Sequence, residues 1–267
     1  SSNTAVGLCA LYANTTGTPN VAVGNFSLCA NTTGTSNTGV GFCALRNNTD
    51  GNSNTGFGRG ALQTNATGDN NTAVGRNALV NNTASNNTTL GFCSLQANTT
   101  GASNTAVGYL SLKDNTTGSA NTAIGQAALD ALTTGSNNTA VGSSAGTSIT
   151  EGANNLALGK SALVFTTTGD HNIALGEDSV RCNTTGDYNI GIGVNALQKN
   201  TGNSNVGIGR NAAACNTTAS GNIAVGDNAF CKNTTGTANT AIGVGALSWN
   251  TTTNCNTAVG YNALLFN

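Results

Sequence analysis

A phrase of 17 residues repeats along almost the whole chain and constrains its fold more than any other feature. The clearest copy, at residues 104–120, reads Asn-Thr-Ala-Val-Gly-Tyr-Leu-Ser-Leu-Lys-Asp-Asn-Thr-Thr-Gly-Ser-Ala. Its opening asparagine occurs sixteen times between Asn3 and Asn256, and the spacing falls to 16 residues only after Asn71 and after Asn189. A period this short and regular indicates a solenoid, in which each repeat contacts mainly its neighbours.

We number each repeat from its asparagine, which is position 0. Position 4 is glycine in all sixteen copies, and position 8 is leucine in twelve. Positions 1 and 3 hold Thr or larger apolar residues, whereas position 2 between them is nearly always Ala or Gly. This alternation, ended by glycine, predicts a short β-strand followed by a turn. We expect positions 1, 3 and 8 to face the core and position 2 to face outward.

The second half of each repeat ends in a corner segment, as in Asn14-Thr15-Thr16-Gly17. Asparagine there bonds nearby backbone, and glycine accepts a positive φ. Repeated Gly and Asn-Thr-Thr disfavour helix. We therefore predict an all-β fold, a parallel β-solenoid (β-helix or β-roll) of about sixteen 17-residue coils. Residues 1–267 are expected to form one repeat domain, excerpted from a longer fibre or array because solenoid ends need caps.

Composition argues against several classes of function. Only 7% of the residues are charged and the net charge is −1, so we expect no nucleic-acid partner. No run of about twenty apolar residues exists, and we expect no membrane insertion. The chain has one histidine, scattered carboxylates and no Cys-x-x-Cys pair. We accordingly predict no catalytic residues, no metal site and no cofactor, and hence no enzyme.

Two of the eight cysteines are candidates for a disulfide. Cys215 and Cys231 fall at positions 10 and 9 of adjacent coils, within reach of each other. Buried thiols or cross-links between chains are the alternatives for the other cysteines.

Several corner asparagines at position 11 lie in Asn-x-Thr sequons. The candidates for glycosylation are Asn14, Asn31, Asn98, Asn115 and Asn233. The alternative is an internal ladder of corner hydrogen bonds. We favour the ladder, because Asn48, Asn82 and Asn200 keep the asparagine without the sequon.

Two regular rows of side chains are candidate binding surfaces. The position 2 row would make a flat strip for packing against another chain, at Ala5, Ala22, Ala73, Ala106, Ala123 and Ala140. The position 12 row would make a surface of hydroxyl and methyl groups suited to ice, at Thr15, Thr32, Thr99, Thr116, Thr184 and Thr234. The alternative for these threonines is that they only satisfy the turn.

The unit Asn-Thr-Ala-Val-Gly-x-x-Ala-Leu-x-x-Asn-Thr-Thr-Gly resembles repeats of phage and giant-virus tail-fibre proteins over residues 3–267. It is more loosely similar to the Asn-Ser-Val-Ala-Ile-Gly motif of trimeric autotransporter adhesin heads. The resemblance implies a solenoid, usually trimeric, that serves as an extracellular fibre or adhesive stalk.

Our leading hypothesis is a non-enzymatic structural fibre or adhesive segment on a virion, on a cell surface or outside the cell. It would self-associate as a homotrimer or filament and contact a cell-surface or glycan receptor through variable positions 5, 9 and 10. The alternative is a monomeric ice-binding solenoid that uses the threonine row. A carbohydrate-active solenoid would need carboxylates and aromatics clustered on one face, which the repeat positions do not show.

Overall fold

The computed structural model describes residues 2–266, which form sixteen strands and no helix. The chain divides into two compact units, Ser1–Thr134 and Gly135–Asn267. Unit 1 contains β1 (Thr4–Val6), β2 (Val21–Val23), β3 (Thr38–Val40), β4 (Thr55–Phe57), β5 (Thr72–Val74), β6 (Thr88–Leu90), β7 (Thr105–Val107) and β8 (Thr122–Ile124). Unit 2 contains β9 (Thr139–Val141), β10 (Leu156–Leu158), β11 (Ile173–Leu175), β12 (Ile190–Ile192), β13 (Val206–Ile208), β14 (Ile223–Val225), β15 (Thr240–Ile242) and β16 (Thr257–Val259).

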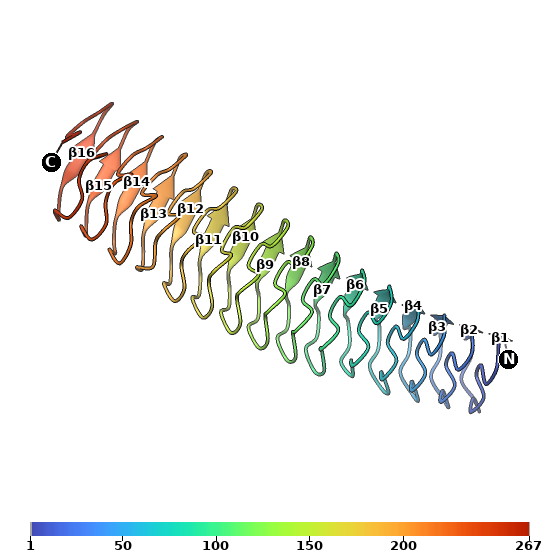
Figure 1. The fold of residues 1–267 in the computed structure, drawn as a ribbon. Helices are drawn as coiled ribbons and strands as arrows, with labels where there is room; N and C mark the ends of the chain where they lie inside the picture. Colours follow the sequence, from blue (N-terminus) through green and yellow to red (C-terminus); the bar gives the residue numbers. More distant parts are fainter. Residues whose placement is uncertain (1, 267) are drawn as a thin grey trace. The chain divides into compact units, whose positions relative to one another are not determined.

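Within each unit, consecutive strands pair in parallel, one strand per coil (Figure 1). The register matches equal repeat positions: Ala106 of β7 lies opposite Ala123 of β8, and Ala157 of β10 lies opposite Ala174 of β11. Backbone bonds also join the coils outside the strands, as where the Leu28 amide donates to the Ala44 carbonyl at 3.0 Å. The predicted all-β parallel solenoid is confirmed.

The side chains of each strand point in the direction opposite to the one that we predicted. Position 2 is the inward position, and the alanines there are fully buried from Ala22 onward, whereas positions 1 and 3 face outward. The predicted core leucines of position 8 are confirmed, since Leu28 and Leu45 are fully buried. A Cβ at Gly39 would lie 3.4 Å from Cγ of Leu28, one coil earlier. The inward position 2 holds only small residues opposite the leucines, Ala or Gly in fifteen coils and Thr89 in the sixteenth, so the larger strand residues must turn outward.

Position 4 brings neighbouring coils into backbone contact. Gly41 has φ +134°, and a Cβ there would lie 2.7 Å from the carbonyl carbon of Gly58 in the next coil. No real side chain makes so close a contact, and L residues rarely adopt this φ. The glycine present in every copy is thus required by the close approach of the coils.

Two ladders of asparagine fill the rest of the interior. At position 0, Nδ2 of Asn104 donates to the Gly118 carbonyl at 2.9 Å, while its Oδ1 accepts the Asn121 amide at 2.9 Å. At position 11, Nδ2 of Asn98 donates to Oδ1 of Asn82 at 2.7 Å and to the Gly101 carbonyl at 2.9 Å. Buried amides are tolerated because each is bonded to the next coil or to its own corner.

The position 11 ladder stops where the sequence abandons asparagine. Leu132, Ile149 and Thr166 take its place in three successive repeats, and all three are fully buried. Oδ1 of Asn115, at the end of the ladder in unit 1, therefore has no bonding partner, and neither has the Thr166 hydroxyl. These repeats keep the strand and the coil of the others, with an interrupted polar interior.

Candidate functional surfaces

The outward face of the strands is an uncharged array. No Asp, Glu, Lys or Arg occupies position 1 or 3 in any repeat. In unit 1 the face is mainly Thr beside Val, with Phe57 and Leu90 each more than half exposed. In unit 2 five consecutive strands carry only Leu, Ile or Val at these positions, as in Leu156 and Leu158. This sheet face is therefore uncharged along each unit, and it is wholly apolar over β10 to β14.

The alanine strip cannot serve as the packing surface that we predicted. Ala22, Ala73, Ala106, Ala123 and Ala140 are all fully buried beneath the strand backbone. Ala5 alone is exposed, because β1 pairs only with β2 and no preceding coil supplies a leucine against it. The prediction was wrong because it took small side chains for surface residues, whereas the narrow interior selects them.

The threonines of position 12 form a row of fixed hydroxyl groups at the surface. The Thr116 hydroxyl donates to the Thr133 carbonyl of the next coil at 3.0 Å, and Thr15, Thr32, Thr99 and Thr234 make the equivalent bond at 3.0 to 3.2 Å. Thr184 also lies on the surface. The row therefore satisfies the corner, as the alternative interpretation held, and it also presents ordered hydroxyl and methyl groups.

The candidate glycosylation sites belong to the interior. Asn31, Asn98, Asn115 and Asn233 are fully buried, and Asn14 is half-buried and bonded to Asn31 and Gly17. The side-chain nitrogen that would bear a glycan donates hydrogen bonds along the ladder. The glycosylation prediction conflicts with this structure, and the internal ladder is confirmed.

The predicted pair Cys215 and Cys231 consists of two free thiols on adjacent coils. The Cys215 amide donates to the Cys231 carbonyl at 3.2 Å, and Sγ of Cys231 lies 3.1 Å from the Ser248 hydroxyl. In unit 1, burial raises the pKa of the Cys29 thiol, and the neighbouring Cys9 adds to the rise.

Over the described part of the chain, no group of three His, Cys, Asp or Glu residues is arranged to hold a metal, and no helix is long and apolar enough to cross a membrane.

A ridge of arginine and aromatic side chains runs along one flank of unit 1. The Arg46 guanidinium lies 5.4 Å from the ring centre of Phe26, and the Arg59 guanidinium lies 5.9 Å from that of Phe42. The two rings meet edge to face, 6.2 Å apart. One coil further, Arg76 lies 5.6 Å from the Phe92 ring. Positions 5, 6 and 9, whose residues differ from coil to coil, supply these residues.

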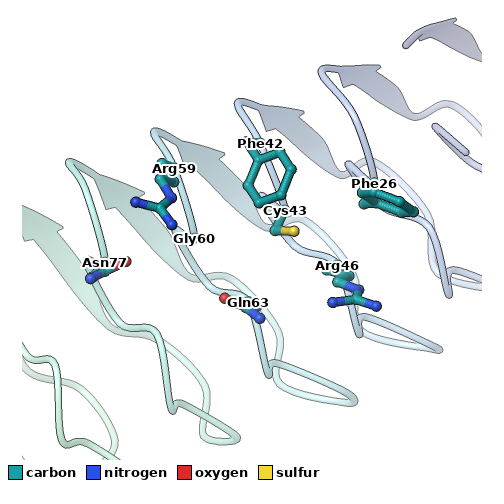
Figure 2. A pocket seen from close by; sticks show the side chains of 8 residues that line it. All are labelled: Phe26, Phe42, Cys43, Arg46, Arg59, Gly60, Gln63 and Asn77. Carbon is teal, nitrogen blue, oxygen red and sulfur yellow. The ribbon is translucent and has the colours of Figure 1, made fainter. Parts of the chain in front are cut away.

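The ridge borders a half-open cavity of about 260 Å³ that spans neighbouring coils (Figure 2). Phe26, Phe42, Arg46 and Arg59 line one part of it, and Gln63 and Asn77 line the rest together with Gly60 and Cys43. From the sequence we expected variable positions 5, 9 and 10 to contact a receptor, but we did not predict a cavity. The missed signal was an arginine in each of three successive repeats, Arg46, Arg59 and Arg76, with Phe42 and Phe92 at the same position 5 as Arg59 and Arg76.

These features define the chain as a parallel β-solenoid repeat protein. Comparison with protein-family models found no match, and comparison with curated proteins found none either. The resemblance to tail-fibre repeats therefore stays a prediction, and function must be argued from the surfaces themselves.

Proposed function

We propose that this chain is a non-enzymatic structural segment of an extracellular, virion or cell-surface fibre. In this proposal it self-associates, as a trimer or filament, through the outward face of its strands. The observation that carries the proposal is the uncharged row of position 1 and position 3 side chains, repeated in every coil. Regular apolar faces of this kind mark sites of association rather than solvated surface.

The size of the face supports association. Eight strands spaced about 4.8 Å apart, each three residues long at about 3.3 Å per residue, cover about 380 Å² in one unit. The largest apolar patch on a typical monomer is of this size, about 300–600 Å², and is often functional. Charged side chains, which commonly protect exposed β-sheet from association, are absent from this face.

The bonding inside the solenoid suits a structural segment. Each coil is bonded to the next through the strands, the corner backbone and the position 0 asparagine ladder, and most coils also through the position 11 ladder. A segment built this way keeps its form without a large hydrophobic core, because most of these bonds recur from coil to coil. In this proposal a receptor would be contacted by the variable positions on the flanks, which are positions 5, 9 and 10.

Light scattering on the purified chain tests the proposal. We expect a mass that is a multiple of the 26.3 kDa monomer. Replacing Val74 and Val107 of the face together by lysine should yield monomer, because charges would be buried in the contact. Thr117→Lys, an exposed corner position away from the strands, should leave the assembly intact. A monomeric wild type, or a lysine pair without effect, would refute association through this face.

Ice binding is the second candidate, and the fixed hydroxyls of the position 12 row favour it. A surface that orders water needs side chains held in one geometry, and these threonines are anchored by bonds to the next coil. Inhibition of ice recrystallisation should then be seen for the wild type, lost in Thr116→Tyr and retained in Thr105→Tyr on the strand face. An inactive wild type would exclude this candidate.

A further inference from the structure

The cavity in unit 1 lies beside a coil that has glycine, Gly60, at position 6. The coils on either side carry Cys43 and Asn77 at this position, and the side chain of Asn77 reaches toward Gly60 (Figure 2). A Cβ at Gly60 would lie 2.8 Å from Oδ1 of Asn77 and 3.4 Å from Oε1 of Gln63. A side chain at position 60 would therefore push against these two polar groups and narrow the cavity.

Two cations face this space without a counter-ion. Within the described residues, no carboxylate pairs with Arg46 or Arg59; the ion pair of unit 1 joins Lys113 to Asp114 instead. Each of the two guanidinium groups lies over a phenylalanine ring. Stacking uses the flat face of a guanidinium and leaves the N–H groups at its edge free to donate. Two such edges beside one cavity favour a bound anion.

The rest of the lining determines what kind of anion fits. The side-chain amides of Gln63 and Asn77 offer both donors and acceptors, as hydroxyl groups require. Phe26 and Phe42 offer apolar surface for the carbon face of a ring. The volume of about 260 Å³ lies just below the range for drug-sized ligands, which matches a single ring.

We propose that this cavity binds an acidic sugar of monosaccharide size. The arginines hold its carboxylate, the amides of Gln63 and Asn77 bond its hydroxyl groups, and the phenylalanine rings cover its carbon face. The site goes beyond the structural role and does not depend on it, since positions 5, 6 and 9 are distinct from the strand-face positions 1 and 3. Its failure would leave the association proposal intact.

A titration followed by amide chemical shifts tests the site, with glucuronate, glucose and acetate as probes at low salt. We expect saturable shifts at Gly60 and its neighbours with glucuronate. Binding of glucose, which lacks the charge, and of acetate, which lacks the ring, should be at least about tenfold weaker. No saturable shift with glucuronate would overturn the proposal, and so would acetate binding as tightly as glucuronate.

Matched variants locate the binding. Gly60→Asn fills the cavity and should abolish glucuronate binding; the fold should tolerate it, because asparagine holds position 6 in five other coils, with φ of 56° at Asn77 against 69° at Gly60. The control Gly245→Asn makes the same change at the same position, also with an asparagine one coil later, and should bind normally. Unchanged binding by Gly60→Asn would refute the site.

A second pair of variants distinguishes the contribution of Arg59 to binding from that of Arg76. Arg59→Gln should weaken glucuronate binding at least about tenfold, because it removes a charged hydrogen-bonding partner. Arg76→Gln changes the same repeat position one coil on, where the arginine lies over Phe92 outside the cavity lining, and should have little effect. Equal losses in the two variants would indicate a diffuse charge effect and would contradict a defined site.

Discussion

Asn98 offers a direct measure of what the asparagine ladder contributes to stability. Its Nδ2 donates to Oδ1 of Asn82 at 2.7 Å and to the Gly101 carbonyl at 2.9 Å, and its Oδ1 accepts from Nδ2 of Asn115 at 2.8 Å. Asn98→Ala removes all three bonds from a fully buried site. At about 0.5–1.5 kcal/mol for each bond, the expected loss in the free energy of unfolding is about 1.5–4.5 kcal/mol.

The partners decide where in this range the loss falls. Asn87 also donates to Oδ1 of Asn82, at 3.2 Å, and to the Gly101 carbonyl, at 2.9 Å, so both acceptors keep one bond. Asn115 loses the partner of one N–H and keeps only its bond to Gly118. One newly orphaned donor costs about 1–3 kcal/mol, which places the expected value near the middle of the range.

Urea unfolding followed by circular dichroism measures the loss, and native-state hydrogen exchange at the Thr99 and Thr116 amides locates it. Because stability in a repeat array is largely a sum of local terms, the exchange of these neighbouring amides should accelerate most. The control Asn47→Ala changes an exposed asparagine and should stay within about 0.5 kcal/mol of wild type. A loss below about 1 kcal/mol for Asn98→Ala would refute the role given to the ladder.

Two further predictions concern buried polar groups. Thr166→Val removes a buried hydroxyl without a partner and should raise the free energy of unfolding by about 1–3 kcal/mol, measured by urea unfolding; a less stable variant would contradict this. Burial raises the pKa of the Asp130 carboxyl above its ordinary 3.8, against the pull of Lys113. The unfolded chain thus loses this proton first, and stability falls as the pH rises from about 3.8 through the folded-state pKa. Asp130→Asn should therefore stabilise the protein more at about pH 7 than at about pH 3 in thermal melts, and equal effects at both would count against it.

The repeat period made the parallel pairing predictable, because a 17-residue spacing places equal positions opposite each other in neighbouring coils. The alternation in Thr105-Ala106-Val107 also identified two faces. Alternation does not say which face is inside, and the usual rule that large apolar residues are buried gave the wrong answer. Leu112 and the asparagines already fill the interior, which leaves room only for Ala106.

The surfaces were less predictable than the fold. Asn98 lies in an Asn-x-Thr sequon, which predicts a glycosylation site, but in the structure it belongs to the buried asparagine ladder. In the sequence, the ladder was favoured only by asparagines such as Asn82, which hold the same position without a sequon. The cavity lies beside Gly60, whose neighbours at the same repeat position, Cys43 and Asn77, are 17 residues away on either side. Such an arrangement is visible only when single repeat positions are compared from coil to coil, since each repeat taken alone looks ordinary.

The orientation of the strands underlies every surface described here, and neighbouring phenylalanine substitutions test it most directly. Val107→Phe places on the outward face a residue that Phe57 already carries at the same position, so the free energy of unfolding should change by less than about 1 kcal/mol. Ala106→Phe forces a ring into the fully buried row and should cost at least about 3 kcal/mol or prevent folding. If Ala106→Phe were tolerated and Val107→Phe were not, positions 1 and 3 would point inward and position 2 outward, and the strand orientation described above would be wrong.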